Sequence, residues 1–264
     1  MRLIGLSRLL KQGRAVEPAG SGASHLRLRA AALESKLVAE APMPRVRIAA
    51  MQPYFLPYAG YFRLFLDVDA FVIGDTFQYI RRGWVNRNRF YDEAGRLQWL
   101  TVPLCRAPTE TEIRHKQFAP DAEKSLRTQI RRFPACRNPE QPAVPILERL
   151  LRPHGSMVDY LMDLLNLSCE VLDITPPHLL KMSDIPVQVG LRGQEWALAA
   201  CHALGATEYV NAPGGRDLYS HELFARHGLS LQFLPPYAGG MESILERLHT
   251  ATPSALANEI RRNL

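Results

Sequence analysis

The stretch over residues 48–90 decides the fold of this 264-residue chain, and it reads IAAMQPYFLPYAGYFRLFLDVDAFVIGDTFQYIRRGWVNRNRF. Its first apolar run ends at Met51 and predicts a buried strand, and the apolar side chains at helical spacing over residues 61–66 predict a helix. A second apolar run, residues 70–74, predicts another strand. Strand, helix and strand in this order form a βαβ unit, so we expect the two strands to pair in parallel.

Two tracts of unusual composition follow the two predicted strands. Residues 52–61 are rich in proline and aromatic side chains, and residues 75–89 are rich in arginine and asparagine. Ligands of open α/β sheets bind beyond the carboxyl ends of the strands, which is where both tracts lie. We therefore expect the functional site to be built from these two tracts.

The rest of the chain predicts a hairpin, then helices, then a second α/β stretch. A turn at residues 92–95 precedes a predicted strand at residues 97–104, and residues 113–118 predict a further short strand. Helical spacing then predicts a helical insertion at about residues 120–175. The elements predicted after the insertion are helices at residues 192–204 and 219–227 and strands at residues 208–210 and 229–234.

These elements predict an α/β fold with a mainly parallel three-layer (Rossmann-like) sheet and a helical insertion. We expect residues 44–264 to form a single domain, in which residues 241–264 carry no assigned element. Residues 1–43 contain a Gly/Ser/Ala-rich segment and two prolines, so we expect a disordered or weakly helical extension. Met43 immediately precedes the first strand and is a candidate native start in place of Met1, which an intact-mass measurement of the native protein tests.

The charge of the chain is unevenly distributed. The formal net charge is +6, and residues 1–44 hold seven Lys/Arg against three Glu, which accounts for +4 of it. The nearly neutral remainder gives no general polyanion signal, so a nucleic-acid partner is not expected. Four widely spaced cysteines without a CxxC pair indicate reduced thiols in a cytoplasmic protein. Neither a membrane span nor a metal site is expected, because no apolar run is long enough and the histidines lack metal-ligand spacing.

The basic tract of residues 75–89 predicts an anion-binding site. Arginine guanidinium groups bind phosphate and carboxylate in a fork geometry, and asparagine offers both donors and acceptors. Trp84 is placed to cover a sugar or a base, and Asp75 follows a strand end, where a carboxylate can orient a hydroxyl or an amine. The alternatives are a solvated basic loop and a nucleic-acid contact. The tract lacks the Lys/Glu mixture of a solvated face, which favours the anion site.

The tract of residues 52–61 predicts a turn that leads into the N-terminus of a helix. Free N–H groups at such a position suit a phosphate or a carboxylate, and the alternative is an aromatic turn that only packs. Its spacing resembles the GxFxxxHxGH turn of the nucleotidyltransferase superfamily, with YAGY at residues 58–61 in the place of HxGH and without its two histidines. KMS at residues 181–183 likewise resembles the KMSKS loop of related synthetases. These resemblances bear on the fold and leave nucleotide binding open as a second function.

A longer series of residues resembles the WbqC-like family. The matching positions are MQPYFLPYAGYF over residues 51–62, then Asp75, Phe77 and Gln78, then RGWVNRN over residues 82–88, and more weakly LGATEYV over residues 204–210. The resemblance spans roughly residues 46–240. It implies a bacterial cytoplasmic protein connected with the biosynthesis of surface polysaccharide, such as O-antigen or capsule.

The activity that the resemblance implies is an acyl or aminoacyl transfer to an amino sugar that is nucleotide-linked or phosphate-bearing. The donor is left open between a coenzyme A thioester and a carrier-protein thioester, so an acyl carrier protein is a candidate partner. Two other functions stay open. One is a nucleotide-binding protein of the HxGH superfamily, and the other is a non-enzymatic partner in the polysaccharide pathway.

The residues expected to form the site come from the two tracts. Asp75 is the candidate general base, because a sugar ammonium must lose a proton before it attacks an acyl carbon. Arg82 and Arg87 are expected to bind the anionic group, and Tyr58 and Trp84 to line the sugar or acyl pocket. The other expected substrate-binding residues are Gln52, Tyr54, Gln78, Asn86 and Asn88.

Overall fold

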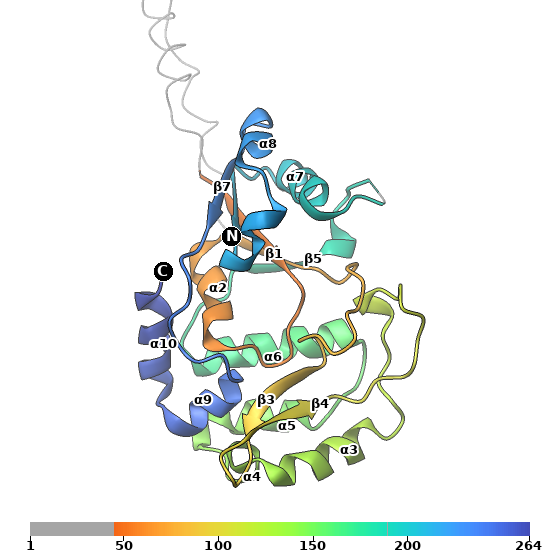
Figure 1. The fold of residues 1–264 in the computed structure, drawn as a ribbon, viewed down its shortest axis with the longest axis vertical. Coiled ribbons are helices and arrows are strands. Elements are labelled where there is room, and N and C mark those ends of the chain that lie inside the picture. Colours follow the sequence, from red (N-terminus) through yellow and green to blue (C-terminus); the bar gives the residue numbers. More distant parts are fainter. Residues whose placement is uncertain (1–44, 189) are drawn as a thin grey trace, which may run out of the picture. The chain divides into compact units, whose positions relative to one another are not determined.

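The computed structural model describes residues 45–188 and 190–264 (Figure 1). The expectations for residues 1–43, an extension and a native start at Met43, lie outside the described residues. Arg45–Leu264 forms one unit by its internal contacts.

The expected βαβ unit opens this fold. β1 (Arg47–Met51) leads through a loop and a short 3₁₀ helix (Ala59–Phe62) into α2 (Arg63–Asp67), and β2 (Ala70–Ile73) follows. β1 and β2 pair in parallel, with residues 48–51 opposite residues 70–73. The two apolar runs therefore form neighbouring strands, as the sequence predicts.

One five-stranded sheet organises the unit, and all of its strands are parallel. The other three strands are β5 (His178–Lys181), β6 (Glu208–Asn211) and β7 (Ser230–Phe233), and the order across the sheet is β5-β2-β1-β6-β7. The fold is therefore α/β. From β1 the chain first adds strands toward β5 and later adds strands toward β7, so the strand order reverses between β1 and β6. Such a reversal is the topological switch point of an open sheet, where ligands tend to bind.

Side chains of the strands alternate between two separate apolar clusters. Phe71 points into a cluster shared with α2 and α6 (Met157–Val171), and its neighbour Val72 points into a cluster shared with α7 (Gly193–Ala203) and α8 (His221–Arg226). Successive residues of a strand face opposite sides of its sheet, which explains why neighbours enter different cores. Both faces of the central strands are buried, as expected for parallel strands.

A second, two-stranded sheet is the predicted hairpin. β3 (Arg87–Tyr91) pairs antiparallel with β4 (Leu97–Thr101), and the turn between them is held by Asp92, which accepts from the N–H groups of Ala94 and Arg96. The basic tract was expected to be loop throughout, but its last three residues belong to β3. Partners on β4, not the local composition, extend the strand back to Arg87.

Helices fill the chain between β4 and β5. They are α3 (Ala122–Gln129), α4 (Pro134–Arg137), α5 (Val144–Leu150) and α6. The short strand expected at residues 113–118 is wrong, because Ile113–His115 forms a 3₁₀ turn in which the N–H of Lys116 donates to the carbonyl of Ile113. Phe118 alone makes a bridge, to Leu104.

The C-terminal residues, which the sequence pattern left unassigned, form α9 (Ile244–Thr250) and α10 (Pro253–Arg262). The hydroxyl of Thr252 accepts from the N–H of Ala255 and caps α10, and Pro253 occupies its first turn. Both helices bury apolar side chains in the cluster that α2 and α6 share.

The described residues contain neither a membrane-spanning helix nor a cluster of metal ligands. None of the helices in residues 45–188 and 190–264 is long and apolar enough to cross a membrane. Over the same ranges, no group of three His, Cys, Asp or Glu side chains is placed to hold a metal ion.

Candidate functional site

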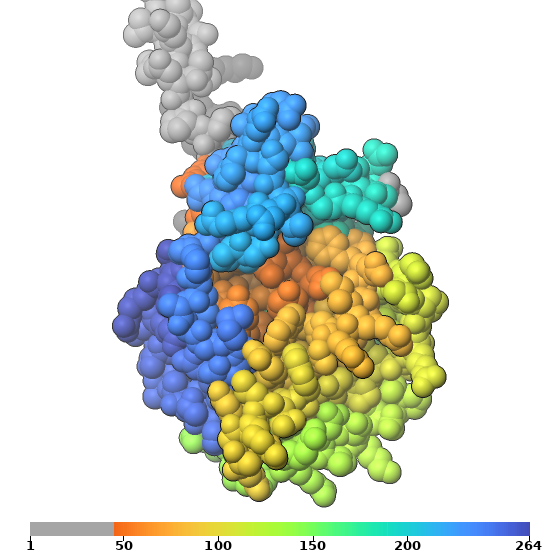
Figure 2. All heavy atoms as spheres, in the orientation of Figure 1, coloured from red at the N-terminus to blue at the C-terminus, as the bar shows by residue number. Residues whose placement is uncertain are grey.

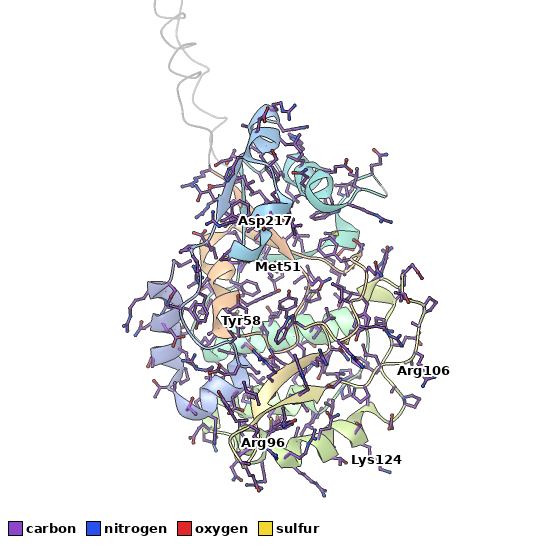
Figure 3. The ribbon with its side chains drawn as sticks, in the orientation of Figure 1. Met51, Tyr58, Arg96, Arg106, Lys124 and Asp217 are labelled. Carbon is purple, nitrogen blue, oxygen red and sulfur yellow. The ribbon has the colours of Figure 1, made fainter. Side chains whose placement is uncertain are left out.

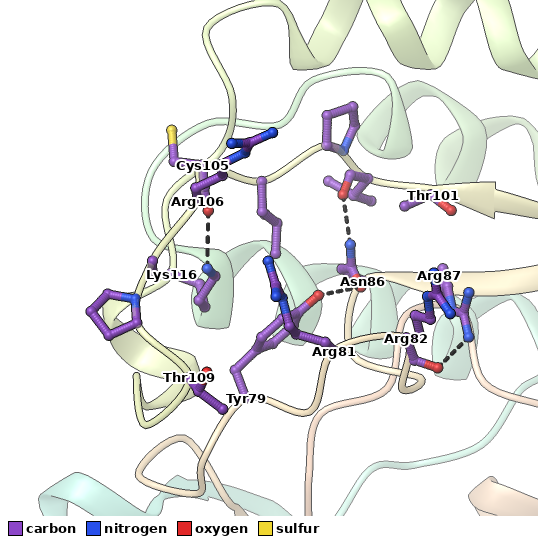
Figure 4. Close-up of a pocket in the computed structure, with 15 residues that line it drawn as sticks. Tyr79, Arg81, Arg82, Asn86, Arg87, Thr101, Cys105, Arg106, Thr109 and Lys116 are labelled. Atoms are coloured by element: carbon purple, nitrogen blue, oxygen red, sulfur yellow. Dashed lines mark hydrogen bonds between the residues drawn. The ribbon is translucent and has the colours of Figure 1, made fainter.

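A pocket of about 700 Å³ opens beside the β3–β4 hairpin (Figure 4). One wall is the basic tract that follows β2, and the opposite wall is the loop that follows β4 together with Lys116. We call it the cationic pocket, because five of its lining side chains are positively charged. They are Arg81, Arg82, Arg87, Arg106 and Lys116.

No carboxylate among the described residues lines the cationic pocket, and none in residues 45–188 and 190–264 pairs with its five cations. Like charges within a few ångströms of each other repel, and the repulsion grows where burial lowers the effective dielectric constant. A bound anion would offset that repulsion. The charge of the pocket thus suits phosphate or carboxylate groups.

Lys116 is the most deeply buried cation of the pocket, with 6% of its surface exposed. Its Nζ donates to the carbonyl of Cys105 at 3.0 Å and lies 4.9 Å from the ring centre of Tyr79 (Figure 4). Burial lowers the pKa of Lys116, because an ammonium loses hydration there. The sequence pattern hid this residue inside a run that resembled a short strand.

Arg82 and Arg87, the two expected anion-binding residues, form a turn at the mouth of the pocket. Arg87 donates from Nε to the carbonyl of Gly83 at 3.2 Å and from Nη2 to the carbonyl of Arg82. Its guanidinium also lies 3.8 Å from the ring centre of Trp99. Arg82 has a φ of 62°, which turns the chain sharply and leaves its side chain exposed. Arg87 therefore supports the turn, and Arg82 is free to contact a ligand.

The side chains of the two asparagines of the basic tract form hydrogen bonds within the protein and do not point into an open site. Asn86 donates to the carbonyl of Val102 at 2.9 Å and accepts from the hydroxyl of Tyr79 at 2.7 Å. Asn88 donates to the carbonyls of Phe55 and Leu56 at 3.1 and 2.7 Å. We call Asn86 and Asn88 the amide bracket. Asn86 touches the pocket wall, and Asn88 lies outside it.

Asp75 lies at the end of β2 with 1% of its surface exposed and is not part of the pocket wall. Its Oδ1 accepts from the N–H of Ser183 at 2.9 Å, and its Oδ2 accepts from the Ser183 hydroxyl at 2.6 Å. The carboxylate thus fastens the turn after β5 to the end of β2. Asp75 and the KMS stretch at residues 181–183 were predicted as separate features, and they meet here.

Gln78 and Trp84 also lie outside the pocket wall. Gln78 is exposed and donates from Nε2 to the carbonyl of Thr109 at 2.9 Å, which ties the basic tract to the loop after β4. The ring of Trp84 lies 5.3 Å from the ring of Trp99 and 5.5 Å from the guanidinium of Arg89.

A second cluster lies beyond the carboxyl end of β1. Arg63, with 1% of its surface exposed, donates from Nη2 to the carbonyl of Pro235 at 2.8 Å, whereas its buried Nε has no partner among the described residues. Tyr58 and Tyr237 lie beside it with ring centres 5.5 Å apart. Burial lowers the pKa of Arg63. We call this the switch-point cluster, because the loop after β1, one of the two strands between which the order reverses, contributes Tyr58 to it, and the chain after β7 contributes Tyr237.

The views separate the two clusters. Figure 3 places Met51 and Tyr58 in the central part of the described unit and Arg106 at its edge. In the space-filling view, orange atoms of the segment after β1 are visible between blue atoms of the C-terminal third and gold atoms of the basic tract (Figure 2).

Comparison with known families decides the relationship of the chain. The family described as "WbqC-like protein family" matches this chain over residues 52–238, a range that includes both clusters. The chain belongs to the WbqC-like family. A protein of Mycobacterium tuberculosis, "Uncharacterized protein Rv1507c", is 30% identical over 184 residues, which are 67% of this chain and 77% of that protein. No solved structure matches the chain.

The WbqC-like chain brings only part of its expected site together. Of the ten expected residues, Arg82, Asn86 and Arg87 line the cationic pocket. Gln52 and Tyr54 lie with Tyr58 in the loop after β1, where the carbonyl of Gln52 accepts from the hydroxyl of Tyr61 at 3.0 Å. Arg81 also lines the pocket and belongs to the basic tract that was predicted to bind an anion. The functional candidates that sequence reasoning missed are Arg63, Arg106 and Lys116.

Each missed residue of this WbqC-like chain carried only a faint signal. Arg63 stands within an otherwise apolar helical stretch, and Lys116 stands between Ile113 and Phe118. A charged residue can stand where the surrounding pattern predicts an apolar one. Such a residue is either exposed to solvent or buried with a structural or functional role. Sequence periodicity does not distinguish the two.

Proposed function

We propose that this WbqC-like protein is a transferase that holds the phosphate of a nucleotide-linked or phosphate-bearing amino sugar in the cationic pocket. The observation that carries the proposal is the set of four arginines, with Lys116 beside them, around one opening without a carboxylate partner in the described residues. Pairing with phosphate is the interaction that such an arrangement favours. The pocket volume of about 700 Å³ lies in the range of small-molecule sites.

The transferred group in this proposal is an acyl or aminoacyl group, as the family resemblance implies, in the biosynthesis of bacterial surface polysaccharide. A coenzyme A or carrier-protein thioester is the donor. In the proposal Tyr58, Trp84, Gln52, Tyr54 and Gln78, which lie outside the wall of the cationic pocket, contact the sugar or acyl part that extends beyond it. Asn86 and Asn88 hold the walls of this site together.

Asp75 has a positioning role in this proposal rather than that of a general base. Both of its oxygens already accept hydrogen bonds from Ser183, and its surface is almost fully covered. A base must reach the proton that it removes. Asp75 instead sets the end of β2, from which the basic tract starts.

We also infer that the unit is a three-layer, Rossmann-like domain. Counted along the chain, the strands of the sheet stand in the order 3-2-1-4-5, which supports this architecture. A cytoplasmic location is part of the proposal, and the four free cysteines support it.

A binding panel on the full chain tests the proposal. Inorganic phosphate, a uridine diphosphate amino sugar, acetyl-coenzyme A and ATP are compared by thermal shift for wild type, Arg82→Ala and Arg131→Ala. Arg131 is the matched control, because it is exposed and lies outside the pocket. A ligand at about 100 times its Kd adds about 2.7 kcal/mol to the free energy of unfolding. We expect the sugar nucleotide to stabilise wild type and Arg131→Ala, and Arg82→Ala to lose about half of that stabilisation, as a roughly tenfold weaker affinity implies.

A second candidate function is nucleotide binding at the switch-point cluster. It is favoured by Arg63, a buried guanidinium without a carboxylate partner in the described residues, close to the reversal of strand order. It predicts that Arg63→Met abolishes a shift produced by ATP whereas Arg82→Ala does not. A folded protein that responds to no ligand in the panel would favour the third function, a non-enzymatic partner in the pathway.

A further inference from the structure

The side chains around the cationic pocket differ in whether they can accept a proton. Arginine stays protonated at physiological pH. Tyr79 donates its hydroxyl to Asn86, and burial raises the pKa of Tyr79, so the phenol keeps its proton. Threonine and asparagine side chains do not ionise. Among the residues that line the pocket, Cys105 and Lys116 remain as groups that could take up a proton.

Cys105 and Lys116 differ in what their polar atoms face. The Sγ of Cys105 donates to the carbonyl of Phe118 at 3.3 Å, a bond that requires the protonated thiol. The Nζ of Lys116 has one hydrogen-bond partner among the described residues, the carbonyl of Cys105, although an ammonium offers three donors. Lys116 is therefore the group whose protonated form is poorly accommodated.

The other charged residues that line the pocket with Lys116 are all arginines. Arg81 and Arg82 come from the tract after β2, Arg87 from β3, and Arg106 from the loop after β4. The loss of water and repulsion from the guanidinium of Arg81 both disfavour a positive charge on Lys116. In agreement, burial lowers the pKa of Lys116, and Arg81 lowers it further against an opposing effect of Cys105.

Carboxylates on the elements packed nearby do not compensate this charge. Glu112 precedes the turn that carries Lys116, and α6, which packs against that turn, holds three carboxylates. Asp159 and Asp163 are paired, and Glu170 is exposed near the C-terminal end of the helix. The pairs are as follows: Glu112 with Arg114 and His115, Asp159 with Lys181, and Asp163 with Arg149.

We propose that Lys116 is the proton acceptor of the cationic pocket and takes a proton from the ammonium group of the amino sugar. The N–H bond of the sugar ammonium breaks, its electron pair stays on the sugar nitrogen, and the proton becomes the third hydrogen of the Lys116 ammonium. The free sugar amine then attacks the acyl carbon of the thioester, a C–N bond forms and the C–S bond breaks. The thiolate leaves and takes the proton that the amide nitrogen loses, which gives the free thiol of the donor. This inference rests on the proposed function and assigns to the pocket wall the role that the sequence suggested for Asp75.

Pyridoxal 5′-phosphate is the probe, because it joins a phosphate to an aldehyde. The arginines attract its phosphate, and its aldehyde condenses with an uncharged amine to an imine and water. Borohydride then adds hydride to the imine and leaves a stable secondary amine, which peptide mass spectrometry locates. Lys124, which is exposed, and Lys181, which is paired with Asp159, are internal controls in the same chain.

We expect Lys116 to be modified at least about tenfold faster than Lys124 or Lys181 near neutral pH, because each unit of pKa changes the uncharged fraction about tenfold. The rate at Lys116 reaches its plateau at a lower pH than the rate at Lys181, whose pKa the partner Asp159 raises. Excess inorganic phosphate slows the reaction at Lys116 alone. Equal rates at the three lysines overturn the proposal.

A second measurement separates this proposal from the proposed function. Formaldehyde with cyanoborohydride methylates uncharged amines without needing the arginines, and calorimetry measures the binding of inorganic phosphate. If phosphate binds and neither aldehyde prefers Lys116, the role of Lys116 is refuted and the proposed function stands. If phosphate fails to bind while formaldehyde still prefers Lys116, the proposed function is refuted and the uncharged amine is supported. Lys116→Met must lose the pyridoxal phosphate adduct at this position. Circular dichroism shows whether that variant is folded.

Discussion

The amide bracket lies in the basic tract, and the cationic pocket combines that tract with Arg106 and Lys116 from the chain after β4, yet the polar groups of the two regions have opposite surroundings. Asn88 is buried, and its amide nitrogen donates to two carbonyls of the loop after β1. Lys116 is also buried, but it uses one of its three donors on the protein and has no carboxylate partner in the described residues. A buried polar group with its partners supports the fold, whereas one without them is a cost to the fold that ligand binding can offset.

The largest expected effect is that of Asn88→Ala. The substitution leaves the carbonyls of Phe55 and Leu56 without their donor, and we expect the free energy of unfolding to fall by about 2–4 kcal/mol. Urea denaturation measures this change. Asn138→Ala is the control, since Asn138 is exposed, and it should stay within about 0.5 kcal/mol. Similar losses in the two variants would mean that the bracket does not support the fold.

Glu246 on α9 sharpens the comparison, because it is buried and incompletely partnered but lies outside the pocket. It is 5% exposed, and its Oε2 has no partner in the described part of the chain. Burial raises the pKa of Glu246 to about 7 from an ordinary value of 4.5, with a smaller effect of Glu242 in the same direction. The folded state therefore binds more protons than the unfolded state between these values, and stability falls as the pH rises through this window.

Glu246→Gln, which cannot ionise, is expected to remove this pH dependence. We expect it to raise the free energy of unfolding by about 1–3 kcal/mol above pH 7, and to have little effect near pH 4. Urea denaturation across this range measures the difference. Glu148→Gln serves as the control, because Glu148 is exposed. A wild-type protein whose stability keeps rising from pH 5 to about 7, relative to Glu246→Gln, would contradict the sign.

The smallest expected effect on stability is that of Arg82→Ala. Its side chain is exposed and has no partner within the described residues, so the free energy of unfolding should change by less than about 0.5 kcal/mol. The affinity for inorganic phosphate, measured by calorimetry, should fall about tenfold, as expected for the loss of one charge-assisted contact. A variant that loses stability but keeps its affinity would place Arg82 with the amide bracket.

Much of the fold follows from local patterns in the sequence. The apolar runs of β1 and β2, the turn at Asp92 and the wide apolar face of α6 are signals that a chain carries without its tertiary contacts. β5 was missed because it is four residues long and follows two prolines. Its pairing with β2 makes it a strand. Thr252 followed by Pro253 is a helix-start signal that the sequence carries for α10.

The sequence by itself determined where β1, β2, β6 and β7 lie, that an arginine-rich tract follows β2, and which family the chain resembles. Only the tertiary structure decided which polar groups face a ligand. Asn88 reaches the carbonyl of Leu56 across 32 residues, and Asp75 reaches Ser183 across 108. Lys116 joins the pocket because the N–H of Cys105 donates to the carbonyl of Gln117 and folds the loop after β4 back. A polar side chain supports the fold when other protein atoms make its hydrogen bonds, and it can bind a ligand when they do not. Those protein atoms come from segments that are distant in the sequence.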